Sequence, residues 1–526
     1  MTLAARDSST PRAWPFLAAL APFLLLVWRF DFLVDDAFIS WRYAQHLAAG
    51  AGLVFNLGEA TPVEGYTNLL WVLALALIQR LGIDPALGSR VLSVGCGVLL
   101  LWLFSGAVAR RRPAPSSALL AGLFLATLPP LVVWATGGLE TMAFALSVFA
   151  THERLGARAD GGPRPVQAGA WALLATLLRA DGFVWVVVVL VAAGIARRRE
   201  PGFARALGTT ALLFALGVAG VFLWRWLQYG ELAPNTARAK VHLGALSLER
   251  GGLYVLSMLL AIPSIAVAIL AACLPPMRKG PSPRPLGGLA LEAGLVLAGG
   301  CAYVILVGGD WMMMYRMLVP AMPFVALLGF CALESCAPRP RLVLGGVCIG
   351  LSLLPSFNLH PVPASVRAAS HFRWGHAEQL TEYEVWKKGV VDIEEWILLG
   401  RALALHTQAG ESCVLGNIGA IPFHSGLTAY DTLGLTNLEE FAPTPPDQRA
   451  SPGHDRVVEV ATFDRYQPTY RGLKLAPASD PFQGLPANWL DPEHPVRASI
   501  QIEIVPLDPA NGFPEDTVLQ LVRNVW

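Results

Sequence analysis

The chain has 526 residues, of which 54% are hydrophobic and only 15% are charged. Soluble domains carry roughly 25% charged residues, so this composition excludes a protein that is soluble throughout. The formal net charge is +1, and the balance shows no basic footprint of the kind that nucleic-acid-binding proteins carry, so we expect no nucleic acid partner.

Long apolar segments occupy the N-terminal two thirds of the chain. They predict a mainly α, polytopic membrane domain over residues 1–356, with about eleven transmembrane helices, some of them short enough to need tilt. The segments are 15–30, 86–109, 116–135, 141–155, 167–178, 183–196, 204–227, 253–274, 287–307, 318–332 and 342–355. Residues 68–81 are also apolar, but this short stretch is interpreted as an interfacial helix.

Basic residues decide the predicted orientation of these segments. Arg6 and Arg12 precede the first segment, and clusters of arginines recur after every second segment. Because short cytoplasmic loops concentrate Lys and Arg, the pattern predicts a multi-pass protein of the inner cell membrane with a cytoplasmic N-terminus. Residues 31–85, 228–251 and 308–315 are then extracytoplasmic, and these loops are where we expect the chemistry.

The composition changes after Pro355, where Ser, His, Pro and acidic residues become more frequent. Residues 357–526 are therefore predicted to form a soluble extracytoplasmic (periplasmic) α+β domain. A helix is predicted over 381–406, and short strands at 412–415, 457–461 and 499–505.

An acidic doublet, Asp35 and Asp36, follows the first segment in VDDAFISWRYAQHL. On a helix, Asp35 and Arg42 share one face, because offsets of three, four and seven residues return to the same side. A carboxylate can take a proton from an acceptor hydroxyl while a cation stabilises a departing phosphate, which suits glycosyl transfer. Asp35 is the first choice for the base and Asp36 the second. The alternative is that both residues only cap the helix.

Other polar groups lie in the same loop and in the segments YGELAPNTARAKVH and GGDWMMMYR. Alternatively, these residues are helix caps, solvated loop residues or interfacial anchors. The residues predicted to bind a donor phosphate are Arg42, Lys240 and Arg316, and the predicted substrate contacts are Glu64, Tyr66, Asn68, Asn235 and Asp310.

In their order along the chain, several motifs together resemble the GT-C superfamily of membrane glycosyltransferases, and within it the group around the mycobacterial terminal arabinofuranosyltransferase. The motifs are DDAFISWRYA, GLVFNLGEATPVEGYTNLLW, TGGLETMAF, LAPNTARAKV, GGDWMMMYRMLVP and IGAIPFHSGLTAYDTLGLTN.

The resemblance implies a polyprenyl-phosphate-linked sugar donor drawn from the membrane lipid. It also implies catalysis on the extracytoplasmic face, with an acidic residue of the first outer loop as base. The expected acceptor is a cell-envelope glycan or protein, and arabinofuranose is one candidate for the sugar. His424 stands where this group commonly has an aromatic residue, and it is included among the candidate substrate contacts.

A divalent cation (Mg²⁺, Mn²⁺ or Ca²⁺) is conceivable between Asp35, Asp36, Glu64 and phosphate oxygens, since hard cations prefer oxygen ligands. The sequence does not demand this cofactor, because arginines alone can stabilise a phosphate. Two rival functions are a transporter or flippase for lipid-linked sugars and a non-catalytic envelope assembly protein. Transporters usually carry ionisable groups at the bilayer midplane and repeated halves, whereas these acids lie in outer loops and no repeat is seen.

Overall fold

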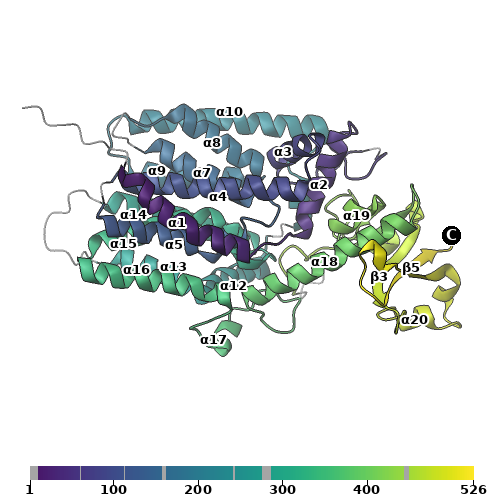
Figure 1. The fold of residues 1–526 in the computed structure, drawn as a ribbon. Helices are drawn as coiled ribbons and strands as arrows, with labels where there is room; N and C mark the ends of the chain where they lie inside the picture. Colours follow the sequence, from purple (N-terminus) through teal and green to yellow (C-terminus); the bar gives the residue numbers. More distant parts are fainter. Residues whose placement is uncertain are drawn as a thin grey trace, which may run out of the picture.

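The structure, a computed structural model, describes residues 10–59, 61–111, 113–156, 162–240, 243–274, 286–442 and 449–526. Arg6, used for the predicted orientation, lies outside the described residues. A long bundle of helices forms most of the molecule, and a smaller part with a β-sheet lies at one end of it (Figure 1).

The bundle consists of helices that run back and forth along its length (Figure 1). They are α1 (Thr10–Arg29), α4 (Pro85–Ala109), α5 (Pro115–Thr127), α6 (Pro129–Val133), α7 (Thr141–Leu155), α8 (Pro165–Leu178), α9 (Gly182–Ala196), α10 (Phe203–Tyr229), α12 (Ala245–Ala261), α13 (Pro263–Cys273), α14 (Gly287–Val307), η1 (Met313–Ala321), α15 (Met322–Ser335), α16 (Pro338–Leu353) and η2 (Leu354–Phe357).

Each of the eleven apolar segments predicted to span the membrane falls on one or two of these helices. Within the described part of the chain, five helices or merged helix pairs have the length and composition to cross a membrane: α4, α10, α14, η1 with α15, and α16 with η2. The chain is thus a multi-pass membrane protein, while the number of spans stays a prediction. The predicted segment 253–274 falls on α12 and α13, which meet at an 89° bend, where Pro263 begins α13 and cannot donate a helical hydrogen bond.

Burial separates the centre of the bundle from its lipid-facing side. Every residue of α15 from Met322 to Leu333 is buried, as expected for a helix that is apolar all round. By contrast, Leu212 and Leu216 of α10 are more than half exposed. Exposed leucines along a long apolar helix are suited to contact with lipid tails.

Two short helices cover the end of the bundle that faces the C-terminal part (Figure 1). They are α2 (Asp35–Ala48) and α3 (Leu69–Arg80). The predicted helix at 68–81 is therefore present as α3, and its interfacial position stays a prediction. A third short helix, α11 (Asn235–Lys240), follows α10.

The C-terminal part combines helices with one five-stranded sheet. The strand order is β2-β1-β3-β5-β4, with β1 parallel to β2 and β3, and β5 antiparallel to β3 and β4. The elements are α17 (Ala364–Ala368), α18 (Glu382–His406), β1 (Ser412–Leu415), α19 (Ala420–Ser425), β2 (Thr428–Asp431), η3 (Val460–Tyr466), β3 (Tyr470–Pro477), α20 (Ala487–Leu490), η4 (Pro495–Ser499), β4 (Ile500–Pro506), η5 (Pro509–Asn511) and β5 (Thr517–Asn524).

This part has the α+β character expected from the sequence. The predicted helix and the strands at 412–415 and 499–505 correspond to α18, β1 and β4. The predicted strand at 457–461 is wrong, because the backbone there turns into η3, whose first bond runs from Thr462 N to Glu459 O. The domain boundary at 356/357 stays a prediction, and it falls at the end of η2.

Candidate active site

A cavity of about 650 Å³ lies between the end of the bundle and the C-terminal part. Its walls come from α2, the loop before α3, the ends of α8, α10 and α14, α11, the loop 308–316 and α18. The charged and polar groups that line it include Asp35, Asp36, Tyr66, Asn68, Glu140, Arg179, Asp181, Arg225, Lys240, Asp310, Arg316, Lys388, Asp392 and His454.

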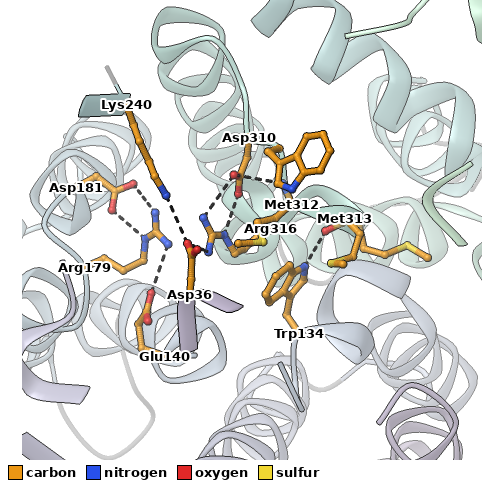
Figure 2. Close-up of polar contacts among 12 residues, drawn as sticks. Asp36, Trp134, Glu140, Arg179, Asp181, Lys240, Asp310, Met312, Met313 and Arg316 are labelled. Atoms are coloured by element: carbon orange, nitrogen blue, oxygen red, sulfur yellow. Dashed lines mark hydrogen bonds and ion pairs between the residues drawn. The ribbon is translucent and has the colours of Figure 1, made fainter. Parts of the chain in front are cut away.

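Asp36 lies between two cations. Lys240 Nζ donates to its Oδ2 at 3.4 Å, and Arg316 Nη1 is 4.0 Å from the same oxygen. Figure 2 shows the carboxylate with Lys240 on one side and Arg316 on the other. Burial opposes ionisation of Asp36, but the charges of Lys240 and Arg316 outweigh it and lower the pKa of this carboxyl group. Asp36 is therefore ionised at neutral pH.

Asp35 has different surroundings although it is the next residue. Its two carboxylate oxygens accept hydrogen bonds from the backbone N–H groups of Gly419 at 3.0 Å and Ala420 at 2.8 Å. Burial raises the pKa of Asp35 to about 7, and the charge of Asp36 adds to this effect, while the two N–H groups oppose it. A carboxylate with a pKa near 7 is suited to act as a general base.

Neither aspartate caps α2. The N-cap residue is Val34, in an extended conformation, and no side chain accepts a capping hydrogen bond there. Neither carboxylate therefore makes a capping hydrogen bond, although both lie in the first turn of α2, where a negative charge favours the helix dipole. The C-terminal part approaches α2 closely here, because a Cβ atom at Gly419 would lie 2.0 Å from the Asp35 carbonyl oxygen. Only glycine fits at that position.

Arg316 is held by two groups of the bundle. Its Nε donates to Asp310 Oδ2 at 2.8 Å, and its guanidinium lies 5.5 Å from the centre of the Trp134 ring. Trp134 also donates from Nε1 to the carbonyl oxygen of Met313 at 3.0 Å (Figure 2). These contacts aim the guanidinium at Asp36 and the cavity.

A second group of charges lines the cavity at the ends of α7, α8 and α9. Arg179 Nε donates to Asp181 at 2.9 Å, and Arg179 Nη1 lies 3.4 Å from Glu140 (Figure 2). Such pairing is the usual arrangement of charged residues at the ends of membrane-spanning helices. Asn68 joins the group by donating to Glu140 at 2.7 Å, and Tyr303 donates to Asp181 at 2.9 Å.

Seven of the eleven residues singled out from the sequence line one cavity. They are Asp35, Asp36, Tyr66, Asn68, Lys240, Asp310 and Arg316. Tyr66 also shares a hydrogen bond of 2.8 Å with Tyr229 at the end of α10. The roles of these seven residues stay predictions.

Arg42 does not line the cavity, which corrects the prediction that it binds a donor phosphate. Its guanidinium is buried and donates to the carbonyl oxygens of Phe55 and Leu427, both at 2.7 Å, and of Pro422. It therefore ties α2 to the C-terminal part and has no N–H group turned towards a ligand. The proposed site omits it.

Three predicted substrate contacts also lie outside the cavity. Glu64 accepts from Arg225 at 3.0 Å, and Asn235 donates to the carbonyl oxygens of Gly434 and Leu435 at 2.8 and 2.9 Å. His424 packs in α19 against Phe38, with 5.6 Å between the ring centres. These side chains support the walls of the cavity rather than face its interior.

The divalent-cation site that the sequence allows, but does not demand, does not fit the residues as they are paired in this structure. Among the described residues, no group of three or more His, Cys, Asp or Glu side chains is arranged to hold a metal ion. Each proposed ligand has another partner, since Glu64 pairs with Arg225, Asp36 with Lys240, and Asp35 with backbone N–H groups. We derive no step through a metal ion.

Several cavity residues were missed in the sequence, among them Arg225, Lys388, Asp392, Trp396 and His454. Arg225 lies near the end of the largely apolar α10, and a charge in such a helix is itself a signal of a functional site or a buried partner. His454 lies in a loop of Ser, Pro and Gly, next to Lys240, and no pattern in the sequence points to it.

Solved structures identify the class to which this fold belongs. The crystal structure of ArnT from Cupriavidus metallidurans bound to undecaprenyl phosphate matches with a TM-score of 0.58 and 15% identity, over 98% of each chain. The same protein in the apo state matches with a TM-score of 0.57 and 15% identity, over 97% of this chain and 98% of that chain. At this identity the likeness concerns the fold alone, and the chain has the fold of the GT-C membrane glycosyltransferases.

The particular relative found by sequence is the terminal β-(1→2)-arabinofuranosyltransferase of Mycobacterium tuberculosis. It is 29% identical over 241 residues, which cover 40% of this chain and 35% of that protein. The match thus spans about a third of the relative's length. A family described as a domain of unknown function (DUF8728) matches residues 384–493. The resemblance to the mycobacterial group is confirmed.

Proposed function

We propose that this chain is a glycosyltransferase that moves a sugar from a polyprenyl-phosphate carrier to an acceptor of the cell envelope. The observation that carries the proposal is the arrangement in the cavity, where a carboxylate suited to act as base lies beside two cations suited to hold a phosphate. The fold shared with ArnT, which was solved with undecaprenyl phosphate, supports a lipid carrier of this kind.

The donor phosphate binds between Lys240 and Arg316 in this proposal. Both cations face Asp36 from different elements, so a phosphate can replace that carboxylate as their partner. The guanidinium of Arg316 offers a planar fork that suits phosphate oxygens, and Lys240 adds a point charge. Asp36 keeps the two cations in place before the donor arrives.

Asp35 acts as the base. It takes the proton from the acceptor hydroxyl, whose oxygen forms the new bond to the anomeric carbon of the sugar. The bond between that carbon and the phosphate oxygen breaks, and polyprenyl phosphate leaves with both electrons. Each carboxylate oxygen has more than one lone pair, so the hydrogen bonds from Gly419 and Ala420 leave room for a further donor.

The cavity lining has parts of different chemistry. Phe183 of α9, Phe222 of α10 and Val307 of α14 belong to it, and such apolar groups suit the isoprenoid chain. Asp392 and Trp396 of α18 also line it, and a carboxylate with an aromatic ring suits the hydroxyl groups and apolar faces of a sugar. In this proposal the acceptor binds beside α18 of the C-terminal part, on the extracytoplasmic side of the inner membrane.

The sugar and the acceptor are finer proposals. The name of the mycobacterial relative supports arabinofuranose as the sugar, and the acceptor in this proposal is a glycan or a protein of the cell envelope. The charged groups that line the cavity lie at the end of the bundle that faces the C-terminal part, as an enzyme at the membrane surface requires, whereas a flippase needs a polar path through the midplane.

The proposal is tested with the purified full chain and undecaprenyl phosphate. Binding measured by native mass spectrometry should be saturable, and Arg316→Lys should weaken it because a lysine cannot form the bidentate contact. Donors with a polyprenyl phosphate linked to different sugars, arabinofuranose included, should release polyprenyl phosphate when cell-envelope glycan is added. A chain that neither binds the lipid phosphate nor consumes any of these donors would refute the proposed function.

A further inference from the structure

The loop 308–316, which carries Asp310 and Arg316, has a constrained backbone. Gly308 and Gly309 have φ values of +87° and +81°, and Met314 and Tyr315 have φ values of +51° and +53°. Glycine adopts positive φ freely, but side chains such as those of Met and Tyr do so only at an energetic cost. Such a conformation persists only where the surrounding structure imposes it.

Two residues of the C-terminal part impose it through the loop backbone. Arg373 donates from Nε to the carbonyl oxygen of Trp311 at 3.0 Å and from Nη2 to that of Met312 at 3.2 Å. Glu382 Oε2 accepts a hydrogen bond of 2.6 Å from the backbone N–H of Met314. This hydrogen bond holds Met314, the first of the two residues with an unfavourable φ.

Arg373 and Glu382 also hold each other. Arg373 donates to both carboxylate oxygens of Glu382, at 2.8 and 3.0 Å, and the two side chains are only 5% and 4% exposed. A buried ion pair is tolerated when the remaining donors and acceptors are satisfied, and here the loop backbone satisfies them. Glu382 is the first residue of α18, which begins with a capping box at Thr381, so the pair stands on a rigid element.

The bundle holds the same loop from the other side. Trp134 binds the carbonyl oxygen of Met313 and lies against the guanidinium of Arg316. Arg250 donates to the carbonyl oxygen of Gly308 at 3.0 Å. The loop backbone is therefore clamped between two parts of the chain, and Arg316 follows directly after the clamped residues.

We propose that Arg373 and Glu382 are positioning residues that set the Arg316 guanidinium for the lipid phosphate. This inference rests on the proposed function, in which Arg316 binds that phosphate. Loss of either residue lets Met314 and Tyr315 relax towards negative φ, which turns the start of η1 and moves Arg316 away from Asp36. The C-terminal part thus completes the donor site without touching the donor.

Affinity for undecaprenyl phosphate, measured on the full chain in detergent, tests the inference. Arg373→Met and Glu382→Ala should each weaken binding about tenfold, the effect of losing one charged hydrogen bond that holds the site. Glu382→Gln keeps an oxygen for the Met314 N–H group and should restore most of the affinity. Arg523→Met is the matched control, because it breaks an ion pair of 2.7 Å with Glu411 elsewhere in the C-terminal part, and it should bind like the parent.

A double-variant cycle separates positioning from a general loss of structure. Arg373→Met combined with Arg316→Met should bind no more weakly than Arg316→Met alone, since the first residue acts through the second. Hydrogen exchange over 308–316 should speed up in Arg373→Met and in Glu382→Ala, only slightly in Glu382→Gln, and not at all in Arg523→Met. These readouts remain informative even if one substitution lowers the yield of folded protein.

Two results would overturn this inference and leave the proposed function intact. In the first, the Arg373 and Glu382 variants bind the lipid like the parent while Arg316→Met binds it more weakly. In the second, the losses of affinity add in the double variant. If Arg316→Met itself binds like the parent, the phosphate site of the proposed function fails, and the positioning role fails with it.

Discussion

Asp35 and Asp36 are adjacent in the chain but differ in what surrounds them, and the difference assigns them different tasks. Asp35→Asn should lower turnover by roughly 100-fold to 10,000-fold, the usual effect of removing a general base, with donor affinity nearly unchanged. Asp36→Asn should change mainly donor affinity, because it removes the charged carboxylate that Lys240 and Arg316 share. Single-turnover kinetics and lipid binding of both variants measure the two effects. If the folded Asp36→Asn protein loses turnover while Asp35→Asn turns over normally, Asp36 is the base and the roles of the two residues are exchanged.

The pKa of Asp35, about 7, predicts the pH dependence. Only the ionised carboxylate accepts a proton, so kcat/KM should fall about tenfold for each pH unit below 7 and level off above it. In Asp36→Asn this acidic limb should move to lower pH, because the negative charge that helps to raise the pKa of Asp35 is gone. A profile that is flat between pH 5 and 8 would exclude Asp35 as the base.

The sequence predicts which residues lie near one another within a single helix, but not which residues of distant segments they contact. The helix carrying the acidic doublet was predicted, and both carboxylates line the cavity. The prediction for Arg42 was wrong because its partners Pro422 and Leu427 lie about 380 residues further along the chain. No periodicity within α2 shows that this face packs against another part of the protein.

At the scale of elements, α18 forms one wall of the cavity. Val385, Lys388, Asp392 and Trp396 line it, and their spacing of three or four residues places them on one helix face. Trp396→Ala should raise the acceptor KM about tenfold, the effect of losing one aromatic contact, with little change in donor KM. Val391→Ala is the control, because Val391 is exposed on the same helix and does not line the cavity. If the acceptor KM of Trp396→Ala is unchanged, α18 does not form part of the acceptor site.

The same element shows why some boundaries were predictable. The capping box of Thr381 and Glu384 lies within four residues of sequence, so the start of α18 could be read locally. The sheet depends on distant pairing instead: β1 joins β3 across more than fifty residues. The strand expected at 457–461 does not join the sheet of the described residues, and its Val458 N–H group makes one bond to the carbonyl oxygen of Thr432, just after β2.

At the scale of the whole molecule, the proposed extracytoplasmic reaction requires the C-terminal part to lie outside the cytoplasm. A cysteine introduced at the exposed Ala510 should react with a membrane-impermeant maleimide in intact spheroplasts, because the arginine clusters place that side outside. A cysteine at Arg198, in the predicted cytoplasmic loop between α9 and α10, should react only after lysis. The reverse pattern would contradict the predicted orientation and the proposed extracytoplasmic site.

The most direct test of the central claim is an experimental structure of the full chain in a lipid bilayer with undecaprenyl phosphate. In the proposed donor site, the phosphate should lie within about 3 Å of both Lys240 and Arg316, and the isoprenoid chain should pass Phe183 and Phe222. A phosphate bound elsewhere, with Lys240 and Arg316 still paired to Asp36, would contradict it.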